Sequence, residues 1–316
     1  MKKTLLALAV VAAAGSVNAA EIYNKDGVAV SVGGAAEVQY FKGFEKDSDA
    51  TIRLDDGELN FGTTVAINDE LNAVGYFDFE FENRDDSGAG STTENAELYA
   101  GIETNGLKAT VGRQYTIGDE AGIGEDYELG TESIGLGDAH GSEVMKLWYT
   151  GDKFWVAFAH DLDNGKAGDK TITDFGASFT PVDALELRAF YYTEEAYGAA
   201  NTIVAKEISS YNLEAIYSFS DFTIAGSFGS IEDDKVANSD VDIISLAGTY
   251  TMGKNTFALG YNQASKYKED VNNVYANITH KLHSNVKAYA EVGYADSDDS
   301  AKDYDFAYVA GLEVKF

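Results

Sequence analysis

The last thirteen residues, Tyr304-Asp-Phe-Ala-Tyr-Val-Ala-Gly-Leu-Glu-Val-Lys-Phe316, alternate strictly between two kinds of side chain. Counting back by twos from Phe316 gives apolar and aromatic residues, with aromatics at both ends of the set. The residues between them are small, apolar or charged, and include Asp305, Glu313 and Lys315. Successive side chains of a β-strand point to opposite faces. A strand of about 9 to 11 residues with aromatics near both ends is typical of one that separates lipid from water.

Residues 1–19 have the composition of a secretory signal. Lys2 and Lys3 are followed by an apolar run from Leu5 to Ala14 and by small residues up to Ala19. A basic start, a short apolar run and a small-residue cleavage site are the parts of an export signal, and this run is too short to span a membrane. We expect residues 1–19 to be removed and residues 20–316 to fold as a single domain in an exported compartment.

The charge and cysteine content exclude several kinds of chemistry. The chain has 53 acidic residues against 23 lysines and arginines, a formal net charge of −30. Phosphate backbones are bound by clustered cations, so we predict no nucleic-acid partner. The chain has no cysteine, which excludes disulfides even in an oxidising compartment.

The content of aromatic residues, glycine and proline favours a membrane β-barrel. The chain contains 20 tyrosines, 17 phenylalanines and 32 glycines but one proline. After the signal it has no apolar run of about 18 residues, the length that a membrane helix needs. A barrel strand exposes only half of its residues to lipid, so its hydropathy stays low, and its hydrogen-bonded ladder excludes proline.

Sixteen segments are predicted as strands, and tight turns alternate with longer loops between them. Asn105-Gly106, between two such segments, is the strongest short hairpin signal. An even number of strands lets an antiparallel up-and-down sheet close, and sixteen strands leave a lumen too wide for side chains to fill. The predicted strands are residues 28–41, 52–67, 71–81, 94–103, 107–115, 143–150, 154–161, 171–180, 185–197, 208–219, 222–231, 241–252, 255–265, 271–282, 285–294 and 304–316.

The connection at residues 116–142 is the longest break between predicted strands. It is rich in glycine and acidic residues. A loop of this length inside a compact domain is normally functional or disordered. In a wide barrel, the functional interpretation is that the loop folds into the lumen and narrows the pore.

Five short motifs occur in the order and at the separations found in a known family. They are the start Ala20-Glu-Ile-Tyr-Asn-Lys-Asp-Gly27, the hairpin at 61–81 with its turn Ile67-Asn-Asp-Glu-Leu71, Tyr99-Ala-Gly101, Gly112-Arg-Gln-Tyr115 and the final Phe316. Over essentially its whole mature length, the chain resembles the general outer-membrane porins of Gram-negative bacteria, the trimeric sixteen-stranded matrix-porin family.

The resemblance implies a homotrimer in the outer membrane, surrounded by lipid and lipopolysaccharide, through which small hydrophilic solutes and ions diffuse passively. It implies that the barrel assembly machinery recognises Phe316. It also implies a third loop folded into each pore, with its acids facing basic residues of the wall. By position, Asp126 matches a loop carboxylate of the family, and Glu128 or Glu132 lies near the second.

The wall departs from the family pattern. The positions that carry Lys or Arg in the family are Ala35, Glu58, Ala96 and, approximately, Ser142 in this chain. A mostly acidic ring attracts cations and repels anions, so the sequence predicts a cation-selective pore. Strand parity assigns further acids to the lumen: Glu37, Asp78, Glu80 and Glu97.

Arg113 and Arg188 are either remnants of a basic wall or partners in structural ion pairs. Trp148 and Trp155 flank the Gly151-Asp152 turn, where an interfacial aromatic belt would explain them. The four histidines are scattered and no activated nucleophile accompanies them. We therefore expect no metal site, no cofactor and no enzymatic activity.

Two other functions are compatible with the sequence. A substrate-selective oligosaccharide porin would need a ladder of aromatic side chains along the lumen, and several residues have the parity to contribute. An adhesin or structural barrel would use its acidic outer loops, which are short apart from 116–142. The candidate ladder residues are Phe41, Tyr76, Tyr99, Phe190, Tyr192 and Tyr289.

Overall fold

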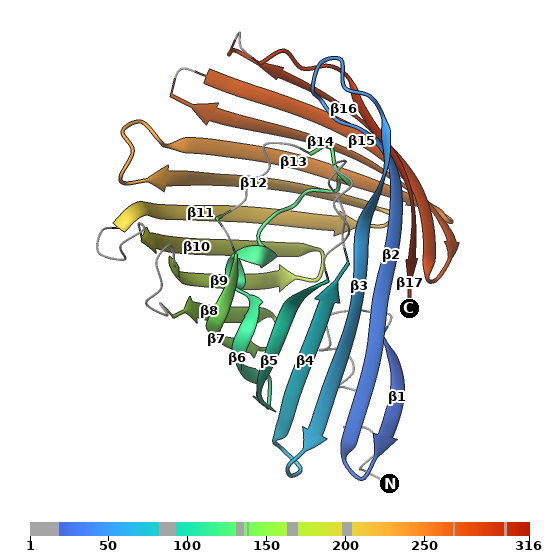
Figure 1. The fold of residues 1–316 in the computed structure, drawn as a ribbon, viewed down its shortest axis with the longest axis vertical. Helices are drawn as coiled ribbons and strands as arrows, with labels where there is room; N and C mark the ends of the chain where they lie inside the picture. Colours follow the sequence, from blue (N-terminus) through green and yellow to red (C-terminus); the bar gives the residue numbers. More distant parts are fainter. Residues whose placement is uncertain are drawn as a thin grey trace.

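The computed structural model describes residues 19–81, 93–130, 136–137, 139–162, 170–197, 204–267, 269–299 and 302–316. These residues form one antiparallel sheet of seventeen strands (Figure 1). Among them, no helix is long and apolar enough to cross a bilayer. The strands are β1 (Ala20–Lys25), β2 (Val28–Lys42), β3 (Thr51–Ala66), β4 (Asn72–Glu80), β5 (Glu94–Thr104), β6 (Leu107–Tyr115), β7 (His140–Thr150), β8 (Phe154–Asp161), β9 (Lys170–Val182), β10 (Leu185–Tyr197), β11 (Val204–Phe219), β12 (Phe222–Asp233), β13 (Val241–Met252), β14 (Asn255–Lys266), β15 (Glu269–His283), β16 (Val286–Ser297) and β17 (Ala307–Lys315).

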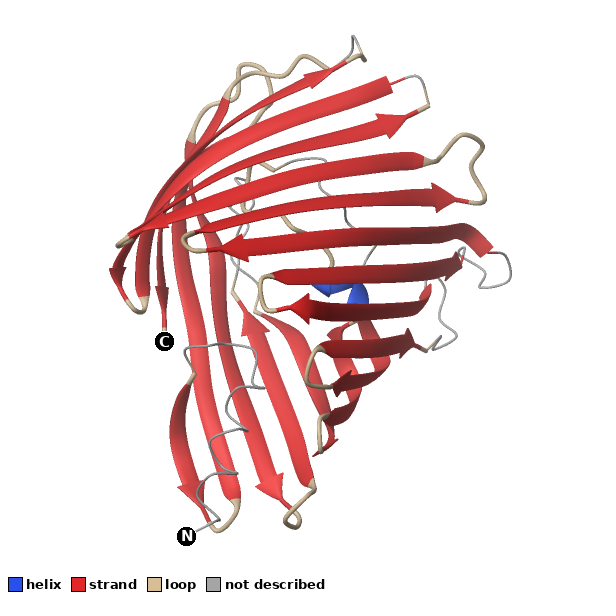
Figure 2. Cartoon of the chain, turned by 180° about the vertical axis from the view of Figure 1, so that it is seen from behind, coloured by secondary structure: helices blue, strands red, loops and turns tan. Residues whose placement is uncertain are grey.

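Strands β2 to β17 close into a barrel of sixteen strands. Each strand pairs antiparallel with its neighbours in sequence, and the last, β17, pairs with β2 from Tyr308 opposite Lys42 to Lys315 opposite Ala35. The closed sheet is seen from behind in Figure 2. Closure satisfies the backbone groups that would otherwise form open edges, which lipid does not tolerate. The predicted fold class and strand number of the barrel are confirmed.

The short strand β1 was not predicted. Its six residues are all exposed, so they carry none of the alternation by which the other strands were found. It pairs with the first part of β2, where Ala20 lies opposite Val32. Phe316 exchanges two backbone hydrogen bonds of 3.0 Å with Gly34, two residues further along β2. β1 and β17 therefore occupy successive stretches of the same edge of β2.

The side chains are distributed inside-out compared with a soluble protein. Large apolar side chains point outward and are exposed, as Val111 (59%) and Leu259 (60%) show. The side chains that alternate with them are polar and buried, among them Asn212, Asn262 and Glu291. An apolar outer band and a polar interior are the pattern of a membrane barrel with a water-filled lumen.

The predicted turns at the short-turn rim form as expected. Asn105 and Gly106 both have positive φ angles, of 43° and 84°. This is the conformation of the two central residues of a type I′ turn, and it favours asparagine and glycine. Asp26 and Gly27, between β1 and β2, repeat it with φ angles of 54° and 81°.

A β-bulge in β3 changes which side chains face the lumen. Two residues, Asp55 and Asp56, lie opposite the single residue Glu37 of β2. A bulge of this kind re-aims the side chains that follow it. Leu54 is exposed on the outer surface, whereas Arg53 lies on the inner side. Uninterrupted alternation, as assumed from the sequence, would place Arg53 towards lipid.

The segment between β6 and β7 begins with a short 3₁₀ helix, η2 (Ile117–Glu120), and continues inside the barrel in the view of Figure 1. Three apolar side chains of this segment, Ile117, Leu129 and Leu136, are fully buried. Ile117 packs in a cluster with Phe190 and Tyr192, and Leu129 packs with Phe44 and Tyr275. Burial of each such side chain contributes about 1.5–3 kcal/mol, so the segment is fixed to the inner wall by apolar contacts as well as polar ones.

The prediction that Trp148 and Trp155 belong to an interfacial belt is wrong. Their rings stack on each other with centroids 4.5 Å apart, and both pack against the inner cluster around Ile117. The neighbouring Tyr149 and Phe154 are the exposed, outward pair. Because the two aromatic residues of each strand are adjacent in sequence, they point to opposite faces, and only one of them can face the membrane interface.

Candidate pore constriction

The tip of the long loop is held by one carboxylate of the wall. Glu291, on β16, accepts hydrogen bonds from the backbone N–H groups of Tyr127 (2.8 Å), Glu128 (2.9 Å) and Leu129 (2.7 Å). Asn277 of β15 also donates to it, at 3.0 Å. Glu291 is 1% exposed, and a buried carboxylate is tolerated only where several donors surround it. The loop backbone supplies three of these donors.

Two further wall carboxylates hold the start of the loop. The backbone N–H of Gly118 donates to Asp174 of β9 at 2.6 Å, and that of Gly122 donates to Glu214 of β11 at 2.5 Å. Arg188 of β10 pairs with Glu214 at 2.5 Å and donates to the carbonyl oxygen of Gly122 at 2.7 Å. We call Asp174, Glu214 and Glu291 the tethering arc. Arg188 is thus part of an ion pair, the second of the two roles that its sequence context allowed.

The loop tip also contacts the bulged strand β3. Arg53 pairs with Glu128 of the loop at 2.6 Å and with Asp55 at 3.3 Å. Gln39 of β2 donates to Glu128 at 3.1 Å and to Asp55 at 2.8 Å. The guanidinium also lies 3.8 Å from the ring centroid of Phe41. One loop carboxylate therefore faces a basic residue, but the residue is Arg53, which the family's wall positions do not indicate.

The loop carboxylates Asp119, Glu125 and Asp126 form no ion pair within 4.0 Å among the described residues. Asp126 accepts a hydrogen bond from the backbone N–H of Gly130 at 3.0 Å, so it stabilises the turn of its own loop. Burial raises the pKa of Asp126, and the nearby Glu128 carboxylate raises it further. Burial is likewise the main cause that raises the pKa of Glu125 and of Asp119. Glu132 lies outside the described residues.

Four predicted wall acids form a patch on β3, β4 and β5, which we call the open arc: Glu58, Asp78, Glu80 and Glu97. The strand register places Glu58 directly opposite Glu80, and Asp78 directly opposite Glu97. Among the described residues, no cation lies within 4.0 Å of any of these carboxylates. Like charges directly opposite each other destabilise a sheet, so the open arc is not explained by stability.

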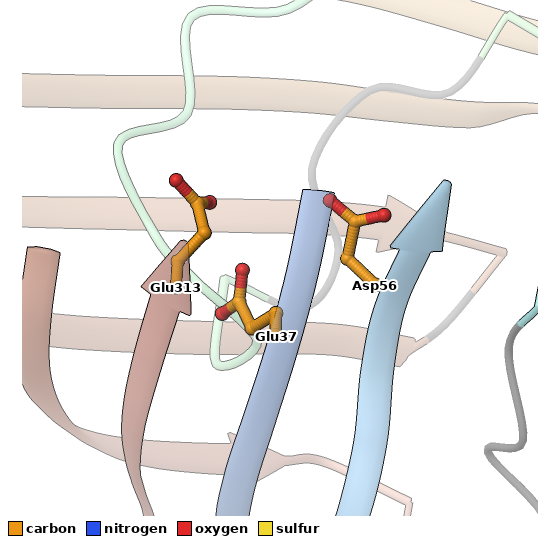
Figure 3. Close-up of side chains that lie close together, drawn as sticks. All are labelled: Glu37, Asp56 and Glu313. Carbon is orange, nitrogen blue, oxygen red and sulfur yellow. The ribbon is translucent and has the colours of Figure 1, made fainter. Parts of the chain in front are cut away.

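A second acidic group, between β17, β2 and β3, is compensated. Oxygen atoms of Glu37, Asp56 and Glu313 lie within 4.8 Å of one another, and Figure 3 shows their three strands side by side. Lys287 and Lys315 pair with Glu313 at 2.8 Å and 3.4 Å. Glu37 also accepts a hydrogen bond from the hydroxyl of Tyr289. Glu37, which strand parity assigns to the lumen, therefore belongs to a hydrogen-bonded network.

The remaining predicted residues lie at the edges of this arrangement. Arg113 donates to the carbonyl oxygen of Asn95 at 2.9 Å and lines a hollow of about 400 Å³ with Glu80 and Glu94. Phe316 is half exposed on the outer surface. The three tethering carboxylates and Arg53 were not predicted. The carboxylates could have been found from the alternation of side chains, which places them on the inner face of their strands. Arg53 could have been found from its neighbours Ile52 and Leu54, which face lipid and so place the residue between them on the inner face.

The candidate oligosaccharide ladder does not present a row of free rings. Tyr192 and Phe190 are 0% and 3% exposed. Tyr289 is covered by Tyr127 of the loop, with parallel rings whose centroids are 3.5 Å apart. Sugar stacking needs accessible ring faces, which these three residues do not offer.

Comparison with known proteins places the chain in a family. A family model described as Gram-negative porin matches residues 5–300. Porin-like protein H of Photobacterium profundum is 41% identical over 340 residues, covering 100% of both chains. Outer membrane protein U of Vibrio parahaemolyticus is 29% identical over 321 residues, covering 95% of this chain and 92% of that protein. The chain belongs to the Gram-negative porins.

Solved structures share the fold of this porin. Outer-membrane expressed OmpT of Vibrio cholerae has a TM-score of 0.77 at 20% identity, covering 94% of this chain and all of that one. An anion-selective porin from Comamonas acidovorans has a TM-score of 0.73 at 14% identity, covering 92% of this chain and all of that one. The family and the barrel locate the protein in the bacterial outer membrane. A porin described as anion-selective has the same fold, so the fold alone does not determine ion selectivity.

Proposed function

We propose that this porin forms a water-filled channel for passive diffusion of small hydrophilic solutes and ions, and that the channel prefers cations. The open arc is the observation that carries the proposal. Its carboxylates point to the inner face of three adjacent strands and have no described cation within ion-pair distance. A ring of uncompensated acids concentrates cations in a pore and repels anions.

The two arginines that contact the loop do not cancel this field, because each is already matched by a carboxylate: Arg53 by Glu128 and Arg188 by Glu214. On the loop, Asp126 and Glu125 add negative charge with no described cation beside them. The acids of the open arc and the loop outnumber the inner-wall cations Lys108, Arg113 and Lys146, which have no described carboxylate within ion-pair distance, so the net field in the lumen is expected to be negative.

The reversal potential of single channels in a planar bilayer tests the proposal. Under a KCl gradient, we expect the sign that corresponds to a cation preference. The preference should weaken as total salt rises, because charges screen over a Debye length of about 8 Å at physiological ionic strength and about 3 Å at 1 M. A reversal potential that favours anions would contradict the cation preference. An outer-membrane barrel that does not conduct would instead favour the adhesin or structural role.

We further propose that the porin works as a homotrimer in contact with lipid and lipopolysaccharide. A solved structure of Vibrio cholerae OmpT, at 22% identity, is described as a trimer form. The exposed apolar band of this chain can be covered either by lipid or by a second copy. Native mass spectrometry of the detergent-extracted protein should give three chains per particle, and a monomer at the same extraction conditions would contradict the trimer.

Export and assembly are proposed to depend on the two chain ends. Residues 1–19 are the cleaved signal, and Phe316 is the residue that the barrel assembly machinery recognises. Deletion of Phe316 should lower the amount of folded porin in the outer membrane several-fold, while leaving refolding of the purified protein in detergent intact. Mass spectrometry should show that the mature protein begins at Ala20. An unchanged amount of folded porin in the outer membrane after the deletion would show that assembly does not require Phe316.

A further inference from the structure

A hollow of about 640 Å³ lies on the inner wall at β5, β6 and β7, towards the short-turn rim. Its size falls in the range of pockets that hold small molecules. One residue of the loop helix η2, Glu120, contributes to it, so the hollow lies between the loop and the wall. The lining residues are Glu97, Tyr99, Glu103, Gly106, Lys108, Thr110, Gln114, Glu120, Lys146, Trp148 and Thr150.

Two ammonium groups line the hollow. Lys108 Nζ lies 5.4 Å from the ring centroid of Tyr99, and Lys146 Nζ lies 5.9 Å from that of Trp148. Neither lies within 4.0 Å of a described carboxylate, whereas Lys287 on β16 pairs with Glu313. Lys146 donates one hydrogen bond, to the carbonyl oxygen of Tyr115 at 3.0 Å, and an ammonium has three donors. Both ammonium groups can therefore donate hydrogen bonds to an anionic partner.

The same hollow offers the opposite charge one strand away. The register places Glu103 of β5 opposite Lys108 of β6, and Lys108 opposite Trp148 of β7. Glu97 lies further along β5. Adjacent strands are about 4.8 Å apart, so acidic and basic groups face the hollow from neighbouring strands. That spacing is comparable with the separation of the charged ends of an amino acid or dipeptide, since each residue spans at most about 3.6 Å.

The ring-bearing part of the hollow is rigid. Trp148 is stacked on Trp155 with centroids 4.5 Å apart, and Tyr99 on Tyr76 with centroids 5.4 Å apart. Trp148 also donates through Nε1 to Thr150 at 3.1 Å. Rings held in one orientation bind an apolar or aromatic group at low entropic cost. The hollow thus combines two free cations, two acids on an adjacent strand and fixed aromatic side chains.

We propose that this hollow is a binding site for zwitterionic solutes of amino-acid or dipeptide size that carry an apolar or aromatic side chain. The carboxylate of the solute binds Lys108 and Lys146, its ammonium group faces Glu97 and Glu103, and its side chain packs on Trp148. The inference rests on the proposed diffusion channel, which delivers the solute. A zwitterion has no net charge, so the acidic constriction that repels anions does not exclude it.

Current blocking by defined dipeptides tests the site on the intact porin. The probes are Gly-Phe, its N-acetylated form without the ammonium, its amidated form without the carboxylate, and Gly-Gly without the ring. We expect Gly-Phe to block transiently, with an affinity about tenfold above that of each analogue, because each analogue lacks one of the three groups that the hollow would bind. Equal blocking by all four probes, or none by Gly-Phe, would overturn the proposal.

Variants assign the blocking to the hollow. K108Q/K146Q and W148L should each weaken Gly-Phe block about tenfold, whereas K153Q, an exposed lysine in the turn after β7, should leave it unchanged. Block that is equally strong in K108Q/K146Q would refute the site. If a variant yields no folded channel, the probe series on the unaltered porin still decides. A porin that conducts with a cation preference but is not blocked would refute this site while leaving the proposed channel function standing.

Discussion

The tethering arc and the open arc use the same side chains for different purposes. Glu291 accepts three backbone N–H groups of the loop and is fully buried. Glu58 and Glu80, on the other side of the seam between β17 and β2, face each other across a strand pair with no described cation near them. An inward carboxylate becomes a structural anchor where loop donors reach it, and a source of field where they do not.

The position of the loop separates the two arcs. Its apolar residues Ile117 and Leu129 bury themselves on the side of β9–β16, so its backbone donors meet the acids there. The acids of β3–β5 are left facing the lumen. Removal of charge from the tethering arc is therefore expected to alter the position of the loop, whereas removal of charge from the open arc is expected to alter ion selectivity.

The largest effect is expected from Glu291→Ala, which breaks the tethering arc. Three backbone N–H groups lose a charged acceptor, and each such hydrogen bond contributes about 1.5–3 kcal/mol. The loop tip should detach intermittently, so single-channel recordings should show closures or conductance substates at least tenfold more often than the unaltered porin. Asp296→Asn, an exposed residue of the same strand, is the matched control. Records identical to the unaltered porin would show that Glu291 is not needed to hold the tip.

Neutralising the open arc should alter selectivity without altering gating. E58Q/D78N/E80Q should lower the ratio of cation to anion permeability several-fold, measured from the reversal potential. It should also raise thermal stability slightly, because like-charge pairs directly opposite each other cost about 0.2–1 kcal/mol. The control D152N/D183N/D221N removes the same charge from exposed short turns. An unchanged permeability ratio would mean that the open arc does not set the field.

Arg53→Gln should shift selectivity in the other direction, by a smaller amount. It removes the guanidinium that pairs with Glu128 and Asp55, so the cation preference should rise. We expect a rise of roughly twofold, because a single charge in the lumen is partly screened by salt. Arg53→Lys keeps the charge and should restore most of the original reversal potential. An unchanged reversal potential in Arg53→Gln would place Arg53 outside the conducting path, and a fall in cation preference would contradict the expected direction.

Acidification should produce the smallest change. Burial raises the pKa of Asp126 from its ordinary value of 3.8 and that of Glu125 from 4.5. The loop's contribution to cation preference is therefore present at neutral pH and is lost as the pH falls through these raised values. Reversal potentials measured between pH 7 and pH 4 should decline earlier than for free carboxylates. D126N/E125Q should reduce that early part of the decline, and an identical pH profile in this variant would contradict the loop's contribution.

Alternation of side chains was sufficient to predict the barrel, because lipid and water impose it on every membrane strand. Tyr304 to Phe316 showed it, and fifteen other segments repeated it. The prediction failed where another effect breaks the period. The bulge at Asp55 and Asp56 inverts the direction of Arg53, and the exposed strand β1 has no buried face to reveal it.

The candidate constriction was less predictable than the barrel. Acidic residues could be assigned to the lumen by parity, as Asp78 and Glu97 were. Whether such an acid meets a loop N–H group, as Glu291 does, depends on where residues 116–142 cross the lumen. That path is set by the burial of a few apolar loop residues against distant strands, and these contacts have no periodic signature in the sequence.

Because β1 and β17 pair with the same edge of β2, the two ends of the mature chain lie close together. Ala20 lies opposite Val32 and Phe316 opposite Gly34, a gap of about 7 Å along the strand. A short linker could join these ends, and new termini could be opened at Asn105-Gly106. Such a circular permutant should refold in detergent yet fail to reach the outer membrane, because Phe316, the proposed assembly signal, would no longer be its last residue. Folding information and delivery information would then be physically separated in one molecule.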